Sequence, residues 1–171
     1  RQRQMCIRDR LQTGEISVGE LQTARRLSRL LDAFYNTRAW QELTRELILN
    51  DRRFLYRFLA YLTEANLIDQ PMSLERRGLV LYEYCKQYYP DYRTQASIAW
   101  IEAGMSLKKL PAEHVKTKRQ IPPEHWEVIY GNYKPELRLC FLPVSTDTEH
   151  GYWFGFESEI QKIAPVFKAR T

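Results

Sequence analysis

The residues best able to bind a metal or act as nucleophiles are few and far apart in this chain. The three cysteines, Cys6, Cys85 and Cys140, are spaced neither like a disulfide framework nor like a paired-thiol metal site. An iron–sulfur cluster with one open iron needs three thiolates close together on one loop, and the sequence lacks that motif. We therefore expect reduced thiols.

The histidines and glutamates give no clearer chemistry. His114, His125 and His150 lie in loop-like sequence, at separations unlike those of metal-binding helices or turns. Exposed histidines are the simpler interpretation, and a long-range metal site that also includes Cys140 is the alternative.

Three acidic residues are candidates for proton transfer: Glu102, Glu113 and Glu124. None has a visible acid or base partner, so we interpret them as solvated carboxylates. The sequence therefore predicts no catalytic, cofactor-binding or metal-binding residue.

The net charge of +5 depends largely on the first ten residues. That decapeptide holds four arginines and one aspartate, a net of 4 − 1 = +3, which leaves 5 − 3 = +2 for the rest. It has no apolar periodicity, and we interpret residues 1–10 as a foreign or disordered leader. The alternative is a basic arm that binds a phosphate backbone.

No apolar run approaches the roughly 18 residues that a membrane-spanning helix needs. The N-terminal sequence also lacks the continuous apolar stretch of a secretory signal. We expect a cytoplasmic setting and no membrane partner.

Apolar residues at helical spacing predict five helices. Ser17 and Glu20 form a capping box at the first start, Ser73 can cap the fourth helix, and Asn66 and Gly104 are expected left-handed stops. The expected helices cover 17–35, a segment around 40–47, 51–66, 73–89 and about 93–103.

The last third of the chain has a different pattern. Residues 105–123 mix lysines with prolines and are expected to be a linker or loop. Residues 124–130 are expected to form a short helix, and 136–144 and 152–157 a β-hairpin that packs on the helices or joins another sheet. The predicted fold is α+β and predominantly α: a five-helix domain over 11–104, followed by a C-terminal unit over 124–171.

The chain is rich in aromatic residues, with 11 tyrosines, 4 tryptophans and 7 phenylalanines. Those on apolar helix stripes, such as Trp40, Phe58 and Trp100, are expected in the core. Aromatic side chains also concentrate at interfaces, because they combine apolar area with a polar group. Seven are candidates for an interface: Tyr82, Tyr89, Tyr92, Tyr130, Tyr133, Tyr152 and Trp153.

Basic pairs recur at residues 25–26, 52–53 and 76–77. Solvated helix faces are the usual explanation for such pairs. If they converged with Lys108, Lys109, Lys116 and Lys118, the domain would instead present a patch for RNA or another anion.

Three stretches carry a resemblance to a known family. They are residues 30–36 (LLDAFYN), residues 51–75 with the string DQPMSLE at their end, and residues 99–104 (AWIEAG) followed by Leu110 and Pro111. In this order they resemble the C-terminal domain of unknown function found in cobalamin-binding radical SAM proteins. The resemblance covers about residues 14–111, and Ala99 departs from it, since relatives are expected to carry an acidic residue there.

The resemblance implies a parent with a cobalamin-binding Rossmann-like domain and a partial TIM-like barrel. That barrel would hold a [4Fe–4S] cluster and cleave S-adenosylmethionine for a radical methylation or rearrangement. None of the parent's ligand residues maps onto this chain, so we expect a non-catalytic accessory domain whose partner is the catalytic barrel of the same polypeptide. The alternative is a stand-alone helical module that binds nucleic acid or a protein.

Overall fold

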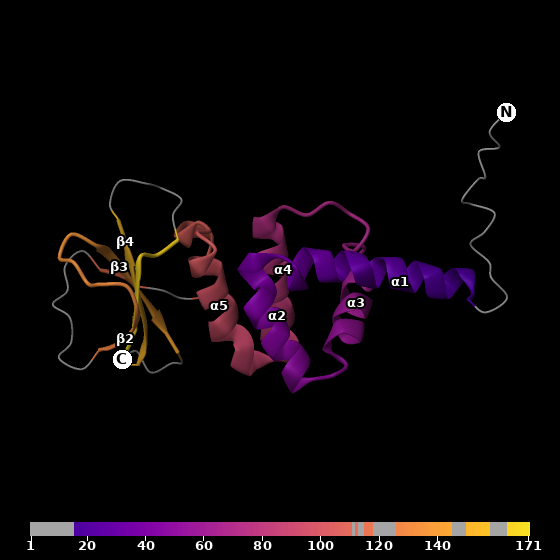
Figure 1. Ribbon diagram of the computed structural model, residues 1–171, viewed down its shortest axis with the longest axis horizontal. Helices are drawn as coiled ribbons and strands as arrows, with labels where there is room; N and C mark the ends of the chain where they lie inside the picture. The colour runs from indigo at the N-terminus through magenta and orange to yellow at the C-terminus, as the bar shows by residue number, and fades with distance from the viewer. Residues whose placement is uncertain (1–15, 111, 113–114, 118–125, 145–149, 158–163) are drawn as a thin grey trace, which may run out of the picture. The chain divides into compact units, whose positions relative to one another are not determined.

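The computed structural model describes residues 16–110, 112, 115–117, 126–144, 150–157 and 164–171 (Figure 1). The expected leader, residues 1–10, lies outside these ranges. The chain divides into two compact units, Arg1–Met72 and Ser73–Thr171. This division differs from the expected helical domain of residues 11–104, because the fourth and fifth helices belong to the same unit as the strands.

The first unit contains α1 (Val18–Leu30), a π-helix (Leu31–Tyr35), α2 (Arg38–Asn50) and α3 (Phe54–Glu64). The predicted capping box is confirmed: the Glu20 N–H donates to Ser17 Oγ at 3.2 Å, and the Ser17 N–H donates to Glu20 Oε2 at 2.7 Å. At Asn66 the predicted left-handed stop is also confirmed, with φ of 55°. Local caps thus set these helix ends, as the sequence indicated.

Aromatic packing holds the first unit together. The Phe34 ring lies edge-on to Phe58 at 4.9 Å, and Phe54 stacks on Phe58 at 5.5 Å. All three side chains are fully buried. They join the π-helix to α3, so residues far apart in sequence share one core.

The second unit begins with α4 (Leu74–Tyr88), a short 3-10 helix (Pro90–Tyr92) and α5 (Arg93–Glu102). Ser73 caps α4 as predicted, since its Oγ accepts from the Arg76 N–H at 3.2 Å. Gly104, with φ of 70°, follows α5 as the predicted stop. Tyr88, at the end of α4, is exposed beside the ring of Tyr84.

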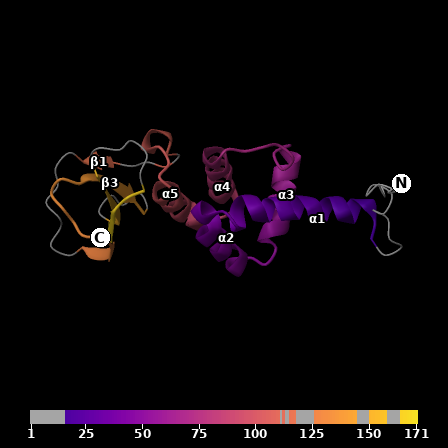
Figure 2. The ribbon, with the colours of Figure 1, turned by 45° about the horizontal axis from the view of Figure 1, so that its top comes forward.

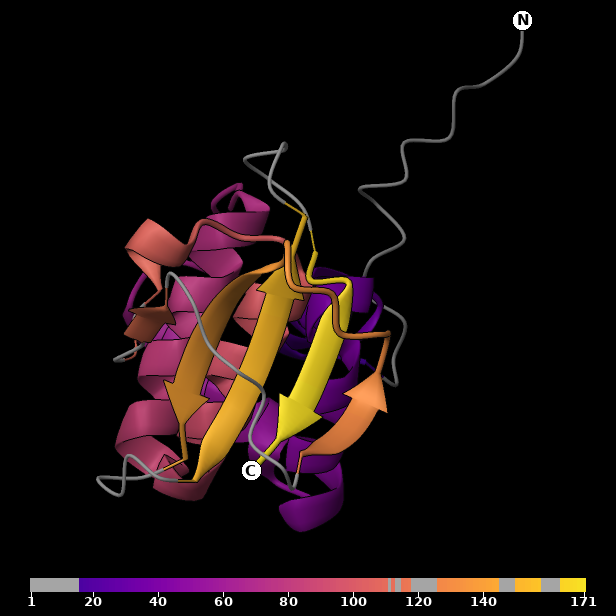
Figure 3. The same ribbon diagram turned by 90° about the vertical axis from the view of Figure 1, so that its left-hand side faces the viewer.

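The second unit also contains a five-stranded antiparallel sheet (Figure 3). Its strands are β1 (Val115–Thr117), β2 (Glu127–Tyr130), β3 (Arg138–Pro143), β4 (Gly151–Phe156) and β5 (Phe167–Arg170), in the order β1-β3-β4-β5-β2. The predicted hairpin is confirmed as β3 and β4. The fold is α+β and mostly α, as predicted.

Two sequence expectations for this unit were wrong. The described part of the expected helix at 124–130 is strand β2, because its residues pair with β5. The expected loop at 105–123 contains a short 3-10 helix (Leu107–Lys109) and strand β1, which pairs with β3. Pairing along both sides of the hairpin relieves the marginal stability of two isolated strands.

Both faces of the sheet are apolar. One face, here the aromatic face, is formed by Leu137, Leu139, Phe141, Trp153, Phe167 and Ala169. The opposite face, here the helix face, includes Cys140, Leu142 and Phe154, and α5 packs beside it against β3 (Figure 2). Burial on both sides explains why β3 and β4 are continuous apolar runs without polar alternation.

Candidate functional site

Strand β2 is an exposed apolar strand at one edge of the sheet. Val128 is 53% exposed, Ile129 46% and Tyr130 36%, whereas Phe167 and Ala169 on the neighbouring strand are fully buried. No backbone hydrogen bond joins the outer side of β2 to another described residue. Exposed apolar edge strands are sites where another chain segment can pair, and soluble proteins usually protect them.

A charged and aromatic cluster lies on the helix face beside β2. The Lys168 ammonium is 2.7 Å from Glu102 Oε1 of α5, and it lies 5.5 Å from the ring centre of Tyr152 and 5.8 Å from that of Phe154. The Arg170 guanidinium lies over the other end of this cluster, 5.9 Å from Tyr152. The ion pair and the rings together compensate the charge of Lys168, whose side chain is only 12% exposed.

Tyr130 connects this cluster to the edge strand, because it pairs in register with Lys168. Burial, and secondarily the negative charge of Glu102, raises the pKa of Tyr130 to about 12. The phenol therefore stays protonated near neutral pH. It can both donate and accept a hydrogen bond at the rim of the sheet.

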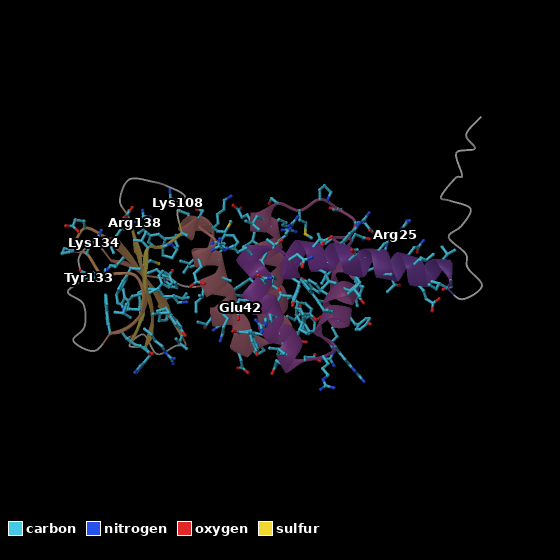
Figure 4. The ribbon with its side chains drawn as sticks, in the orientation of Figure 1. Arg25, Glu42, Lys108, Tyr133, Lys134 and Arg138 are labelled. Atoms are coloured by element: carbon cyan, nitrogen blue, oxygen red, sulfur yellow. The ribbon has the colours of Figure 1, made fainter. Side chains whose placement is uncertain are left out.

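On the aromatic face, Trp126 stands directly before β2. Its ring stacks on Trp153 at 5.7 Å, meets Tyr133 edge-on at 5.7 Å and lies 5.5 Å from Phe167. The indole N–H groups of Trp126 and Trp153 are buried, and neither has a hydrogen-bond partner among the residues that the structure describes. Figure 4 labels Tyr133 beside the strands of this unit.

Four of the seven aromatic residues predicted for an interface lie at the sheet, as two pairs on its opposite faces. Tyr130 and Tyr152 lie near Lys168 on the helix face, and Tyr133 and Trp153 surround Trp126 on the aromatic face.

The other three candidates, Tyr82, Tyr89 and Tyr92, lie on or after helix α4. Tyr89 and Tyr92 follow α4 in sequence, and the ring centres of Tyr89 and Tyr84 are 5.8 Å apart. Tyr82 is 4% exposed and, like Trp153 at 6%, is a buried residue of the core. Their rings lie on apolar faces of α4 and β4, where packing within the chain covers them.

Sequence reasoning missed Val128, Ile129 and Lys168. The only local signal for β2 was the adjacent β-branched pair, Val128 and Ile129, which favours a strand over a helix. No local signal marks Lys168, because its importance depends on Glu102, 66 residues earlier.

The structure places no metal ligands together within its described ranges. His150 is exposed, and His114 and His125 lie outside those ranges. Cys85 and Cys140 are buried, on α4 and β3 respectively. Burial raises the pKa of Cys85 to about 12, which disfavours the thiolate form that binds metals.

Several basic side chains have acidic partners. Arg26 and Arg29 both bind Asp69, at 2.7 and 2.6 Å, and Lys109 binds Glu75 at 2.7 Å. Lys118, and the side chain of Lys116, lie outside the described part of the chain. The basic pairs 25–26 and 52–53 belong to the first unit and 76–77 to the second, so a common basic patch stays a prediction.

Among the described residues, no helix has both the length and the apolar character required to span a bilayer. Comparison with family models, curated proteins and solved structures gives no match to this chain.

Proposed function

We propose that this chain is a non-catalytic C-terminal accessory domain of a cytoplasmic, cobalamin-dependent radical SAM enzyme. It docks on the catalytic barrel of the same polypeptide through the β2 edge of its sheet, and there it helps to cover or position substrate. The ordered sequence resemblance over about residues 14–111 supports the family, and the exposed edge strand supports the docking role.

The observation that carries the docking role is the exposure of Val128, Ile129 and Tyr130 beside β5, whose Phe167 and Ala169 are fully buried. Contiguous apolar surface of this kind marks interaction sites. Tyr130 adds a phenol group on β2 itself, and tyrosine is enriched where a surface is covered by a partner. The edge therefore fits a protein partner better than an anionic one.

The parent's cofactors would supply radical chemistry elsewhere in the polypeptide. The described cysteines do not fit a cluster-binding loop, because Cys85 lies on α4, Cys140 lies on β3, and both are buried. This chain would contribute surface rather than ligands.

Recovery of the reading frame upstream of Leu11 from the source DNA tests the family. We expect a closely spaced three-cysteine motif behind a cobalamin-binding segment. A start codon just before Leu11 would contradict the proposal and favour a stand-alone binding module.

Binding in trans tests the docking role. The upstream polypeptide and this chain would be produced separately and titrated against each other. We expect Ile129→Asp to weaken binding at least tenfold, because it places a charge in the covered edge. Leu49→Asp is the matched control, since Leu49 is the most exposed large apolar residue of the first unit. If both variants bound the upstream polypeptide equally well, docking through β2 would be contradicted. The same holds if the chain bound RNA in a salt-sensitive way and did not bind the upstream polypeptide.

A further inference from the structure

We propose that Gln70, Pro71 and Met72 form a hinge, about which the second unit changes its orientation while each unit keeps its own fold. Hinges of this kind are a few loop residues that absorb changes in backbone dihedral angles. The hinge does not depend on the proposed function, because every residue that forms it belongs to this chain.

The two units are connected by a single segment of the chain. The first unit ends at Met72 and the second begins at Ser73. Each unit has buried aromatic residues of its own, Phe34 and Phe58 in the first and Phe167 in the second. Units of one chain that each have a core are expected to move relative to one another unless a large apolar interface joins them. The connecting segment is the place that absorbs such motion.

On the side of the first unit, the chain is firmly held as far as Asp69. The Ile68 N–H donates to the Leu62 carbonyl oxygen at 3.3 Å, and the Ile68 side chain is buried. The carboxylate of Asp69 then accepts from Arg26 at 2.7 Å and from Arg29 at 2.6 Å, through different oxygens. Charge-assisted hydrogen bonds to two guanidinium groups restrict the carboxylate more than a single ion pair does. These contacts fix the end of the first unit on α3 and α1.

On the side of the second unit, the chain is held again from Ser73. Ser73 Oγ accepts from the Arg76 N–H at 3.2 Å, and the Ser73 carbonyl oxygen accepts from the Arg77 N–H at 3.0 Å. In the first turn of α4, Glu75 binds Lys109 of the same unit at 2.7 Å. The start of α4 is therefore fixed both by its own cap and by an ion pair within the second unit.

The segment between these two fixed points has few contacts. The Gln70 N–H donates to the Leu67 carbonyl oxygen at 3.2 Å, but among the described residues no backbone–backbone hydrogen bond involves Pro71 or Met72. Gln70 and Pro71 are exposed. The proline ring fixes φ of Pro71, and a residue before proline favours extended backbone. Rotation is therefore concentrated in ψ of Pro71 and in the two dihedral angles of Met72.

Amide residual dipolar couplings test the hinge in the complete chain of 171 residues. The couplings of each unit would be fitted separately to an alignment tensor in one dilute alignment medium. Motion about the hinge gives the two units tensors of different magnitude, and this is the result we expect. Equal magnitudes for the two units would overturn the hinge, because two parts of one rigid body share a single tensor.

A pair of proline substitutions tests where the hinge lies. Pro71→Gly frees the dihedral angle that proline fixes, so we expect the difference between the two tensor magnitudes to widen. Pro135→Gly is the matched control, because Pro135 is an exposed proline between β2 and β3, within the second unit. We expect it to leave the difference unchanged.

An equal effect of the two substitutions, or no effect of either, would overturn a hinge at residues 70–72. Amide chemical shifts away from the substituted residue report whether each unit of each variant keeps its fold. If Pro71→Gly fails to fold, the comparison of the two tensors in the unaltered chain decides alone.

Discussion

The ammonium of Lys168 lies 2.7 Å from a carboxylate oxygen of Glu102, which stands 66 residues earlier in the chain. This contact joins β5 to α5 across the helix face of the sheet. The lysine is the more buried partner, and the rings of Tyr152 and Phe154 flank its ammonium. The pair therefore fixes the sheet on its helix next to the edge strand that we assign to docking.

Glu102→Gln should lower the free energy of unfolding by about 1–2 kcal/mol, because it leaves the ammonium of Lys168 without its anion in a largely buried place. Glu75→Gln removes a more exposed pair with Lys109 and should cost less than about 1 kcal/mol. Urea unfolding of the two variants checks this difference. Equal losses would show that the Glu102 pair is no more than a surface contact.

Tyr130 should make the stability of the chain fall at alkaline pH. Burial and the charge of Glu102 raise its pKa in the folded chain to about 12, above the ordinary value of 10.0. A raised pKa contributes stability that is fully present below pH 10 and is lost as the pH rises from 10 to 12. The unaltered chain should therefore lose more stability than Tyr130→Phe between pH 9.5 and 11.5, as measured by urea midpoints at about 0.5-unit steps. Equal losses of stability in the unaltered chain and in Tyr130→Phe would contradict the raised pKa of Tyr130.

Two glycines of β4 should tolerate alanine far less well than a helical glycine. A Cβ at Gly151 would lie 2.4 Å from the Leu142 carbonyl oxygen and 2.6 Å from the Phe141 ring, and one at Gly155 would lie 2.9 Å from Leu137. Gly151→Ala should therefore destabilise the chain by about 2 kcal/mol or more, because rigid backbone must move.

The matched control is Gly19→Ala in α1, where a Cβ meets nothing closer than Ser17 Oγ at 4.0 Å. That substitution should stabilise the chain by up to about 1 kcal/mol, since alanine favours helix. Thermal unfolding of both variants gives the comparison. Similar melting temperatures for the two variants would contradict the close approach of Leu142 and Phe141 to Gly151.

The helices and the central hairpin could be predicted because their signals are local. Ser17, Ser73, Asn66 and Gly104 mark helix ends through their own side chains or backbone conformations. The hairpin strands are long apolar runs, which stand out without knowledge of their partners.

The short strands could not be predicted in the same way. Strands β2 and β5 have four residues each, and their state depends on pairing with each other rather than on a pattern within either. The sequence marked Tyr130 and Tyr152 as candidates for an interface. It could not show that Lys168 lies beside them, because that position follows from the register of β5 against β2 and β4.

Cys85 should resist alkylation in the folded chain. Its side chain is fully buried, and burial raises the pKa of its thiol from 9.0 to about 12, so the reactive thiolate is scarce at pH 8. Iodoacetamide labelling followed by peptide mass spectrometry should modify Cys85 in urea and leave it unmodified in buffer. Labelling at similar rates in both solutions would contradict its burial.

Photo-crosslinking from the edge strand tests the central claim most directly. A benzophenone amino acid would replace Ile129 in the whole polypeptide, with a second protein carrying it at Leu49 as the control. We expect crosslinks from position 129 to the catalytic part and none to the same region from position 49. No crosslink from position 129, or crosslinks only to residues of this chain, would contradict a docked edge.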